Sequence, residues 1–247
     1  MISKQNLSDK KLTVIFPMAG DGTRFGDGYK PFLKVQNEYF IEAAINPFLK
    51  WKNMIKEFVF VYRNDQEKKY NVSKKLNEIF DKINYKSIIL DKTTSGPVET
   101  ISMALDISKI RDNAIFCDCD HSINVDPLFR IILNDNVYDC VLPVMKIDER
   151  EVQSWAIISV DRNMKMLDIA EKSIPIISNN YYGVIGCYYF KKAHKIHRYY
   201  NKLKAKNFSE IICEYKQMDK LIKACKINEA TLFGDPGALE NIINNAD

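Results

Sequence analysis

Short apolar runs that alternate with helical patterns are the feature that most limits the fold of this 247-residue chain. Residues 12–16, 57–62 and 113–117 are short enough for strands and apolar enough to be covered on both faces. Helical patterns lie between them, at residues 40–48, 64–83 and from residue 97 onward. Strands that alternate with helices form a parallel sheet, which binds ligands at the carboxyl ends of its strands.

The second half of the chain departs from this alternation. Strands are predicted at residues 138–144, 154–160, 164–169 and 184–190, with a hairpin turn at residues 161–163. Helices are predicted at residues 125–134, 193–203, 208–224 and 238–241. A short strand at residues 87–90 completes the first half.

The loop after the first apolar run is rich in glycine and carries two cations. Its notable residues are Gly20, Gly22, Arg24, Gly26, Gly28 and Lys30. Glycine lets backbone N–H groups turn toward an oxyanion where a Cβ would collide with it, and Arg and Lys supply the charge that a triphosphate needs. The loop therefore predicts a phosphate-binding site.

Two common phosphate-binding loops do not fit this segment. No glycine has Gly-Lys at the spacing that a Walker A loop requires. The dinucleotide fingerprint needs a third glycine where Phe25 stands, and it leaves no reason for Arg24 and Lys30.

The segment Gly20-Asp21-Gly22-Thr23-Arg24-Phe25, followed by Lys30-Pro31-Phe32-Leu33, resembles the signature of nucleotidyltransferases that make activated sugars and related metabolites. The resemblance covers residues 14 to 239. It implies a Rossmann-like, mixed but mainly parallel sheet flanked by helices (GT-A-like), with a β-rich acceptor-binding insertion in the second half. It also implies a single domain over residues 1–247, with a nucleotide-binding half at about 10–135 and an acceptor-binding half at about 136–247.

The resemblance assigns roles in the first half. Arg24 and Lys30 would be catalytic, acting on the triphosphate charge. The nucleotide would be bound by Ala19, Gly20, Asp21, Gly22, Thr23, Ser95, Gly96 and Asp118. For Ser95, an ordinary helix N-terminus built from small polar residues explains the sequence equally well.

Two carboxylates, Asp118 and Asp120, follow the apolar run at 113–117. Carboxylates at a strand end suit a hard divalent cation that bridges phosphate oxygens. The resemblance puts Mg²⁺ on Asp120, with Asp118 as its helper. His121 is interpreted as a structural neighbour, because Mg²⁺ favours oxygen ligands. In the alternative interpretation both acids only cap the helix at 125–134. Asp118-Cys119-Asp120 is also the Asp-x-Asp motif of metal-dependent glycosyltransferases.

In the second half, Glu171-Lys172 and the run Gly186-x-Tyr-x-Phe resemble motifs of the same family. They imply that Lys172 holds the acceptor phosphate as a catalytic residue, and that Glu171, Asn180 and Gly186 bind the acceptor. No glycine stands at residues 154–156, where relatives specific for sugars place one beside the hexose. This weakens an assignment to glucose 1-phosphate.

The segment Gly234-Asp235-Pro236-Gly237 departs from the family pattern. Relatives usually have Gly-Thr-Pro there and a metal-binding Asp two residues ahead, where this chain has Leu232. Either Asp235 takes over as second metal ligand, or the metal depends on Asp120 alone. His194 and His197 are three residues apart, but without an acid partner nearby they are interpreted as ordinary surface or packing residues.

Composition excludes other classes of protein. The formal charge of +4 is small and spread along the chain, so no nucleic acid partner is expected. No run approaches the roughly 18 apolar residues of a membrane span, and the N-terminal residues 1–11 are polar. Six cysteines without a CxxC pair are typical of a reducing compartment. We expect a cytoplasmic protein with no membrane partner, and a homodimer is compatible with the sequence.

The predicted activity is a Mg²⁺-dependent transfer of a nucleoside monophosphate from CTP, UTP or dTTP to a phosphorylated acceptor, with release of pyrophosphate. The acceptor would be a sugar 1-phosphate, or a small ester such as phosphocholine or a phosphorylated amino acid, used for capsule or surface polysaccharide precursors. Two alternatives remain open: a glycosyltransferase that uses Asp118-Cys119-Asp120, and a relative that binds nucleotide without catalysis.

Overall fold

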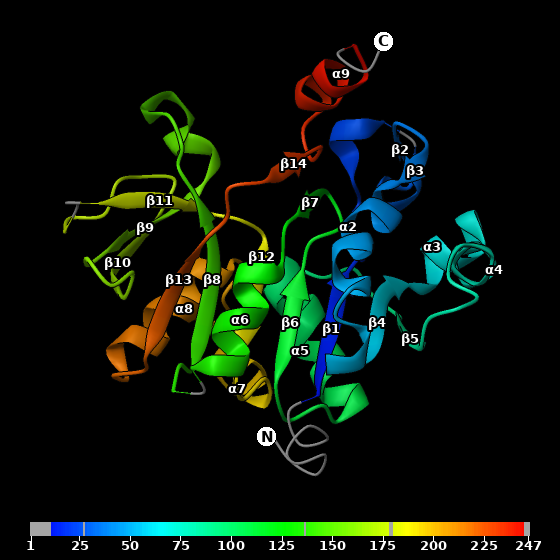
Figure 1. The fold of residues 1–247 in the computed structure, drawn as a ribbon. Coiled ribbons are helices and arrows are strands. Elements are labelled where there is room, and N and C mark those ends of the chain that lie inside the picture. The colour runs from blue at the N-terminus through cyan, green and yellow to red at the C-terminus, as the bar shows by residue number, and fades with distance from the viewer. Residues whose placement is uncertain (1–10, 27, 136, 178–179, 245–247) are drawn as a thin grey trace.

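A computed structural model describes residues 11–26, 28–135, 137–177 and 180–244. Residues 1–10, used above in the argument on targeting, lie outside these described residues. A ten-stranded sheet forms the centre, with helices on both faces (Figure 1). None of the described helices has the length and hydropathy of a bilayer-spanning segment.

The central sheet combines a parallel and an antiparallel part. Its order is β10-β9-β11-β8-β12-β6-β1-β4-β5, and β13 pairs with β8. Strands β6, β1, β4 and β5 run parallel, whereas β12, β8, β11, β9 and β10 pair antiparallel. The bounds are β1 Leu12–Pro17, β4 Ile55–Arg63, β5 Tyr85–Leu90, β6 Ala114–Cys117, β8 Cys140–Met145, β9 Ala156–Val160, β10 Met166–Glu171, β11 Tyr181–Val184, β12 Cys187–Phe190 and β13 Ile222–Lys226.

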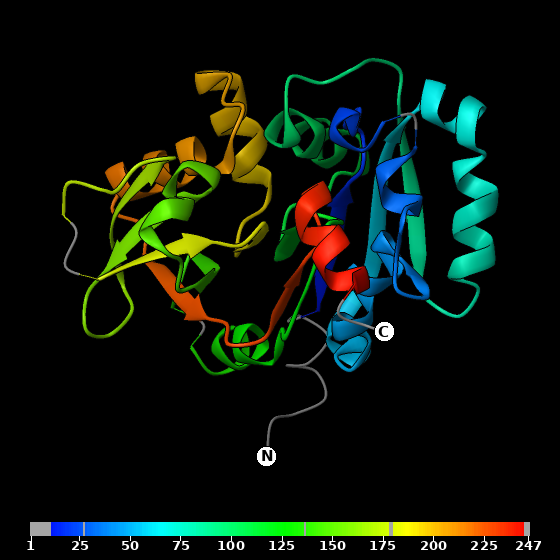
Figure 2. The same ribbon diagram turned by 90° about the horizontal axis from the view of Figure 1, so that it is seen from above.

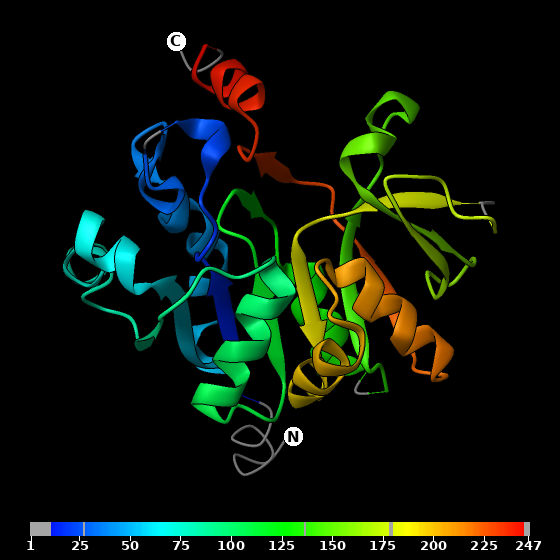
Figure 3. The same ribbon diagram turned by 180° about the vertical axis from the view of Figure 1, so that it is seen from behind.

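Helices cover the two faces of the sheet (Figures 1 and 3). One face carries α2 (Phe40–Leu49), α4 (Val72–Ile79) and α6 (Asp126–Asn134), and α3 (Asn64–Tyr70) leads into α4. The other face carries α5 (Pro97–Ser108), α7 (His194–Leu203) and α8 (Phe208–Gln217). Successive residues of a strand point to opposite faces, so in β1 Val14 joins one core and Ile15 the other.

Two small sheets complete the fold. Strands β2 (Lys34–Val35) and β3 (Glu38–Tyr39) form one, and β7 (His121–Ile123) pairs with β14 (Ala230–Leu232) in the other. The second pairing brings the C-terminal segment beside the end of β6, because the Phe233 N–H donates to the Asp120 carbonyl at 3.0 Å. Helix α9 (Pro236–Asn244) follows and lies near β2 (Figure 2).

Three predicted elements differ from the structure. The helical prediction at 208–224 was wrong after Gln217, because the chain turns at Asp219, with φ +53°, and forms β13. In β13 the side chains of Ile222, Ala224 and Cys225 are buried, and the strand pairs with β8. The burial gained by this pairing outweighs the helical pattern of the local sequence. The expected helix at 64–83 is two helices broken at Asn71, with φ +50°, and the expected strand at 184–190 is divided into β11 and β12.

Candidate active site

The carboxyl ends of β1, β4 and β6 meet at one edge of the sheet, and a pocket of about 410 Å³ opens there. We call it the nucleotide pocket, after the ligand that the sequence resemblance predicts for its residues. Among its lining residues are Gly20, Gly22, Thr23, Arg24, Lys30, Thr94, Ser95, Gly96, Asp118 and Asp120. The structure therefore brings together the glycine loop, the start of α5 and the acidic end of β6, which are far apart in the sequence.

The glycine loop turns at two positions that favour glycine. Gly22 has φ +63° and Gly26 has φ +71°, both in the left-handed region. A Cβ on Gly22 would also lie 3.0 Å from the Cβ of Lys30. With these turns, Arg24 is exposed and lines the pocket. Lys30 is half-buried and lies on the side of the loop that faces the end of β6.

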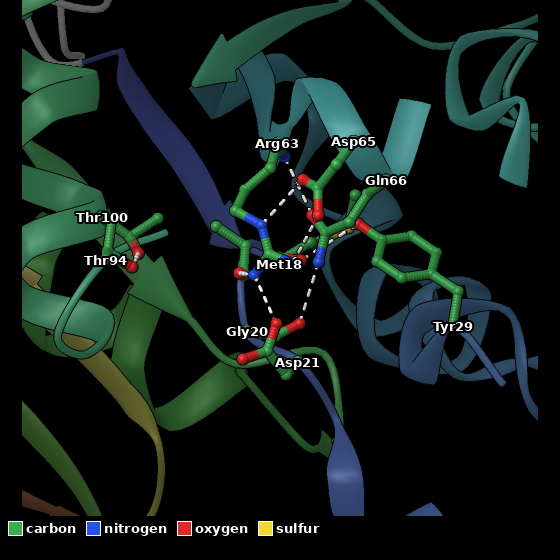
Figure 4. Close-up of polar contacts among 10 residues, drawn as sticks. Met18, Gly20, Asp21, Tyr29, Arg63, Asp65, Gln66, Thr94 and Thr100 are labelled. Carbon is green, nitrogen blue, oxygen red and sulfur yellow. Dashed lines mark hydrogen bonds and ion pairs between the residues drawn. The ribbon is translucent and has the colours of Figure 1, made fainter. Parts of the chain in front are cut away.

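Three successive carbonyl groups of the glycine loop are bound by side chains on one side (Figure 4). The Tyr29 hydroxyl donates to the Met18 carbonyl at 3.0 Å. Arg63 Nη1 donates to the Ala19 carbonyl at 2.6 Å, and Gln66 Nε2 to the Gly20 carbonyl at 2.9 Å. In a planar trans peptide the carbonyl of one residue and the N–H of the next residue point in opposite directions. The N–H groups of residues 19–21 are therefore turned away from these side chains and, within the part of the chain that the structure describes, donate to no protein acceptor.

Arg63 is itself held firmly at the end of β4. Its Nε and Nη2 donate to the two carboxylate oxygens of Asp65, each at 2.9 Å, and Nη1 pairs with Asp21 Oδ1 at 2.7 Å. The Arg63 side chain is only 7% exposed. Arg63 and Gln66 are not among the site residues predicted from the sequence. The sequence does contain a signal for Arg63, namely a basic residue at the end of a buried strand. The carboxyl ends of parallel strands lie together at the edge of the sheet where ligands bind.

Lys30 joins the glycine loop to the end of β6. Its ammonium nitrogen lies 2.5 Å from Asp120 Oδ2, and His121 Nδ1 lies 3.4 Å from Asp120 Oδ1. Burial acts to raise the pKa of Asp120, but the hydrogen bond from His121 and the charge of Lys30 outweigh it and hold that pKa well below its usual range. Asp120 is therefore ionised at neutral pH.

Asp118 lies in a different environment. Burial, reinforced by the charge of Asp120, raises the pKa of Asp118 well above its usual range, and no described residue donates a hydrogen bond to its carboxylate. Glycines leave space for both acids, because a Cβ on Gly186 would lie 2.2 Å from Asp118 Oδ2 and one on Gly234 would lie 2.4 Å from Asp120 Oδ2. Two closely spaced carboxylates that line the nucleotide pocket fit Mg²⁺, which is bound in proteins through one or two carboxylates together with substrate phosphates.

A second pocket of about 550 Å³ adjoins the first. We call it the acceptor pocket, after the ligand that the sequence resemblance predicts for Glu171 and Gly186 in its lining. Arg24, Pro97, Asp118 and Asp120 line both pockets. The acceptor pocket extends toward the antiparallel part of the sheet. Its other lining residues include Glu151, Ser154, Trp155, Glu171, Gly186, Tyr188, Ser209 and Asp235.

Several predicted site residues do not line these pockets. Ala19 is buried behind the loop, and Asp21 pairs with Arg63. Lys172 is exposed, and its backbone N–H donates to the Trp155 carbonyl; Asn180 is also exposed. Neither Lys172 nor Asn180 lines the acceptor pocket. Their roles in binding the acceptor stay predictions, as do the roles of the residues that do line the pockets.

Asp235 has a structural role that the sequence did not reveal. Its Oδ1 accepts the N–H of Gly237 at 3.0 Å and that of Ala238 at 3.4 Å, so it caps the start of α9. Within the described residues, no group of three or more His, Cys, Asp or Glu side chains forms a metal site. The role of Asp235 as second metal ligand stays a prediction.

The two helical histidines make packing contacts. His197 Nδ1 lies 2.9 Å from the Ser102 hydroxyl, and His194 Nδ1 lies 2.7 Å from the Arg111 carbonyl. These polar contacts agree with the interpretation of both histidines as ordinary surface or packing residues.

Solved structures with the same fold include two pyrophosphorylases and a CTP transferase. A nucleoside-diphosphate-sugar pyrophosphorylase from Vibrio cholerae RC9 has a TM-score of 0.74 and 20% identity, covering 94% of this chain and 99% of its own. An inositol-1-phosphate CTP transferase from T. maritima has a TM-score of 0.74 and 13% identity, covering 95% and 96%. A UTP-bound UGPase from Acinetobacter baumannii has a TM-score of 0.75 and 14% identity, covering 96% and 93%. These similarities confirm the predicted fold. No family model and no curated protein sequence matches the chain.

Proposed function

We propose that this protein is a nucleotidyltransferase. It moves a nucleoside monophosphate from CTP, UTP or dTTP to a small phosphorylated acceptor and releases pyrophosphate. The solved structures named above support the proposal, since they share the fold and carry descriptions of this activity. A role in making precursors for capsule or other surface polysaccharides, in the cytoplasm, belongs to the same proposal.

The observation that carries the proposal is the junction of the two pockets. Arg24, Asp118 and Asp120 line both the nucleotide pocket and the acceptor pocket. A transfer between two phosphate-bearing substrates needs a place where both phosphates meet near cationic and metal-binding groups. The junction offers this arrangement.

The reaction needs no protein nucleophile. A phosphate monoester has its second pKa at about 6, so it is mostly a dianion at neutral pH. One of its oxygens attacks the α-phosphorus and forms a new P–O bond, while the bond from the α-phosphorus to the bridging oxygen breaks and pyrophosphate leaves with the electron pair. Lys30 and Arg24 would stabilise the charge that spreads over the transferring group, and the N–H group of Gly20, which lines the nucleotide pocket, would bind the triphosphate.

Mg²⁺ would be held by Asp120 together with Asp118, where it would neutralise phosphate charge. The Lys30 ammonium group pairs with Asp120, so it lies at the same end of β6 and would add its positive charge there.

The proposal is tested by incubating the protein with each of four NTPs and a set of acceptor phosphates in the presence of Mg²⁺. We expect pyrophosphate release, together with a product whose mass equals nucleoside monophosphate plus acceptor. A glycosyltransferase, the alternative that Asp118-Cys119-Asp120 favours, would release no pyrophosphate and would instead consume a nucleotide sugar. Nucleotide binding without any turnover would indicate a relative that does not catalyse the reaction.

Replacing Asp120 by asparagine is expected to raise the Mg²⁺ concentration that gives half-maximal activity by roughly tenfold or more, because the ion loses an ionised ligand. A Mg²⁺ titration of kcat measures this shift. Asp126→Asn is a suitable control, since Asp126 pairs with Lys50 and bonds to Trp51, away from both pockets. An unchanged titration for Asp120→Asn would place the ion elsewhere.

A further inference from the structure

The acceptor pocket contains more negative charge than phosphate transfer requires. Its described lining residues include five acidic side chains, Asp118, Asp120, Glu151, Glu171 and Asp235, against a single arginine and no lysine. Asp118 and Asp120 are explained by the metal, and Asp235 caps α9. Glu151 also binds a backbone N–H at the start of the 3-10 helix Glu149–Ser154, through one carboxylate oxygen, whereas Glu171 has no such capping role.

Neither Glu151 nor Glu171 is neutralised by another residue in the described part of the chain. No ion pair involves either carboxylate among the described residues. Even Lys172, the neighbour of Glu171 in the chain, is not paired with it. An acceptor phosphate that enters this pocket would be repelled by both glutamates, because like charges at short range disfavour each other. A positive group elsewhere on the same acceptor would turn this repulsion into attraction.

The position of Glu171 is set by its neighbours. It ends β10 opposite Ala156 of β9, and its Oε2 accepts a hydrogen bond from the Ser209 hydroxyl at 2.6 Å. That bond orients the carboxylate and uses only one of its two oxygens. The Glu151 Oε2 is oriented in a similar way, because it accepts the N–H of Asp148 at 2.9 Å.

Two aromatic rings line the same pocket. The Trp155 ring packs over Gly183, where an added Cβ would lie 3.1 Å from Trp155 Cδ2. The Tyr188 ring stacks on Phe208, with centroids 4.3 Å apart. Both rings are thus held in place by their contacts. Aromatic faces attract ammonium groups, and carboxylates beside them add to that attraction.

We propose that the acceptor is a phosphate monoester that also carries an ammonium group. Its phosphate lies at the junction with the nucleotide pocket, and its ammonium group lies among Glu151, Trp155, Glu171 and Tyr188. This inference rests on the proposed nucleotidyltransferase activity and selects one class of acceptor within it. A neutral sugar phosphate could also donate hydroxyl groups to glutamates, so the test must vary the charge while it keeps the shape.

Two matched pairs of acceptors make that comparison. Phosphocholine is compared with 3,3-dimethylbutyl phosphate, which has the same shape without the charge, and glucosamine 1-phosphate is compared with glucose 1-phosphate. Pyrophosphate release gives kcat/KM for each compound with the NTP that the protein uses best. We expect the ammonium compound to exceed its neutral partner by roughly tenfold or more in at least one pair.

The outcomes separate the two proposals. If both neutral acceptors, glucose 1-phosphate and dimethylbutyl phosphate, are used as well as or better than their ammonium partners, the inference is overturned and the nucleotidyltransferase proposal stands. Absence of pyrophosphate release with every acceptor and every NTP would overturn both.

Two variants test whether the preference for ammonium-bearing acceptors arises in the acceptor pocket. Glu171→Gln removes the charge and keeps the side-chain shape, so we expect the ratio of kcat/KM between ammonium and neutral acceptor to fall by roughly five- to tenfold. Glu149→Gln is the matched control, because Glu149 is exposed and does not line the acceptor pocket. An equal ratio in Glu171→Gln and wild type would contradict the assignment of the ammonium group to this carboxylate. The thermal unfolding midpoint of each variant verifies that the fold is kept.

Discussion

Replacing Arg24 by alanine is expected to lower kcat by roughly 10² to 10³-fold, the loss that follows removal of one preorganised charge donor. Arg24 is exposed and lines both pockets, and no ion pair or hydrogen bond of its side chain with another described residue is present. Its guanidinium is therefore available to the phosphates that meet at the junction. Because no contact that holds the fold is lost, the unfolding midpoint should stay close to that of the wild type.

The control for Arg24→Ala is Arg162→Ala. Arg162 is an exposed arginine in the turn between β9 and β10, and it lines neither pocket. Steady-state kinetics on both variants would separate a loss at the junction from a general effect of lowered positive charge. Near-wild-type turnover in Arg24→Ala would remove this residue from the mechanism. Lys30→Ala is a less direct test, because Lys30 also pairs with Asp120.

Replacing Arg63 by methionine is expected to raise the KM for the NTP by roughly tenfold and to lower the free energy of unfolding by about 1–3 kcal/mol. Arg63 does not line the nucleotide pocket, so it would act as a positioning residue through the backbone of the glycine loop. Without its guanidinium the Ala19 carbonyl loses its partner, and the peptide that presents the Gly20 N–H is no longer held. The side chains of Asp21 and Asp65 are 56% and 69% exposed, so water can solvate them once Arg63 is gone. This solvation limits the loss in the free energy of unfolding.

Kinetics and denaturation distinguish this role from a merely structural one. A positioning role predicts that the KM for the NTP changes while the KM for the acceptor does not. The Arg63→Lys variant should resemble Arg63→Met in its KM for the NTP and in its stability. One ammonium group cannot contact Ala19, Asp21 and Asp65 in the geometry of the guanidinium group. Asp65→Asn should have a smaller effect than Arg63→Met, since it keeps the contact with Ala19. If Arg63→Met loses stability but keeps its KM for the NTP, the positioning role is wrong.

The first half of the site could be predicted from the sequence to a large extent. Gly22, Arg24 and Lys30 follow a buried strand within a few residues of each other, and Asp118 and Asp120 follow another. Because parallel strands end at the same edge of a sheet, these local patterns place the two groups near one another. The structure agrees, with Lys30 2.5 Å from Asp120.

The second half was less predictable. Lys172 and Asn180 were assigned by resemblance, but the structure does not bring them to the wall of the acceptor pocket, whereas Glu151, Trp155 and Tyr188 line it. These residues come from separate segments, and their approach depends on how the antiparallel strands pair rather than on spacing along the chain. β13 was missed for a similar reason, since only its pairing with β8 outweighs the helical pattern of residues 208–224.

The sequence by itself determined the alternation of strands and helices, the glycine loop with its two cations and the acidic strand end, because each depends on neighbours close along the chain. Only the tertiary structure decided which way the loop presents its N–H groups, through Tyr29, Arg63 and Gln66, and which charges meet in the acceptor pocket. Side-chain contacts between distant segments depend on packing and strand pairing, and these are set by the burial of the whole core rather than by any one segment.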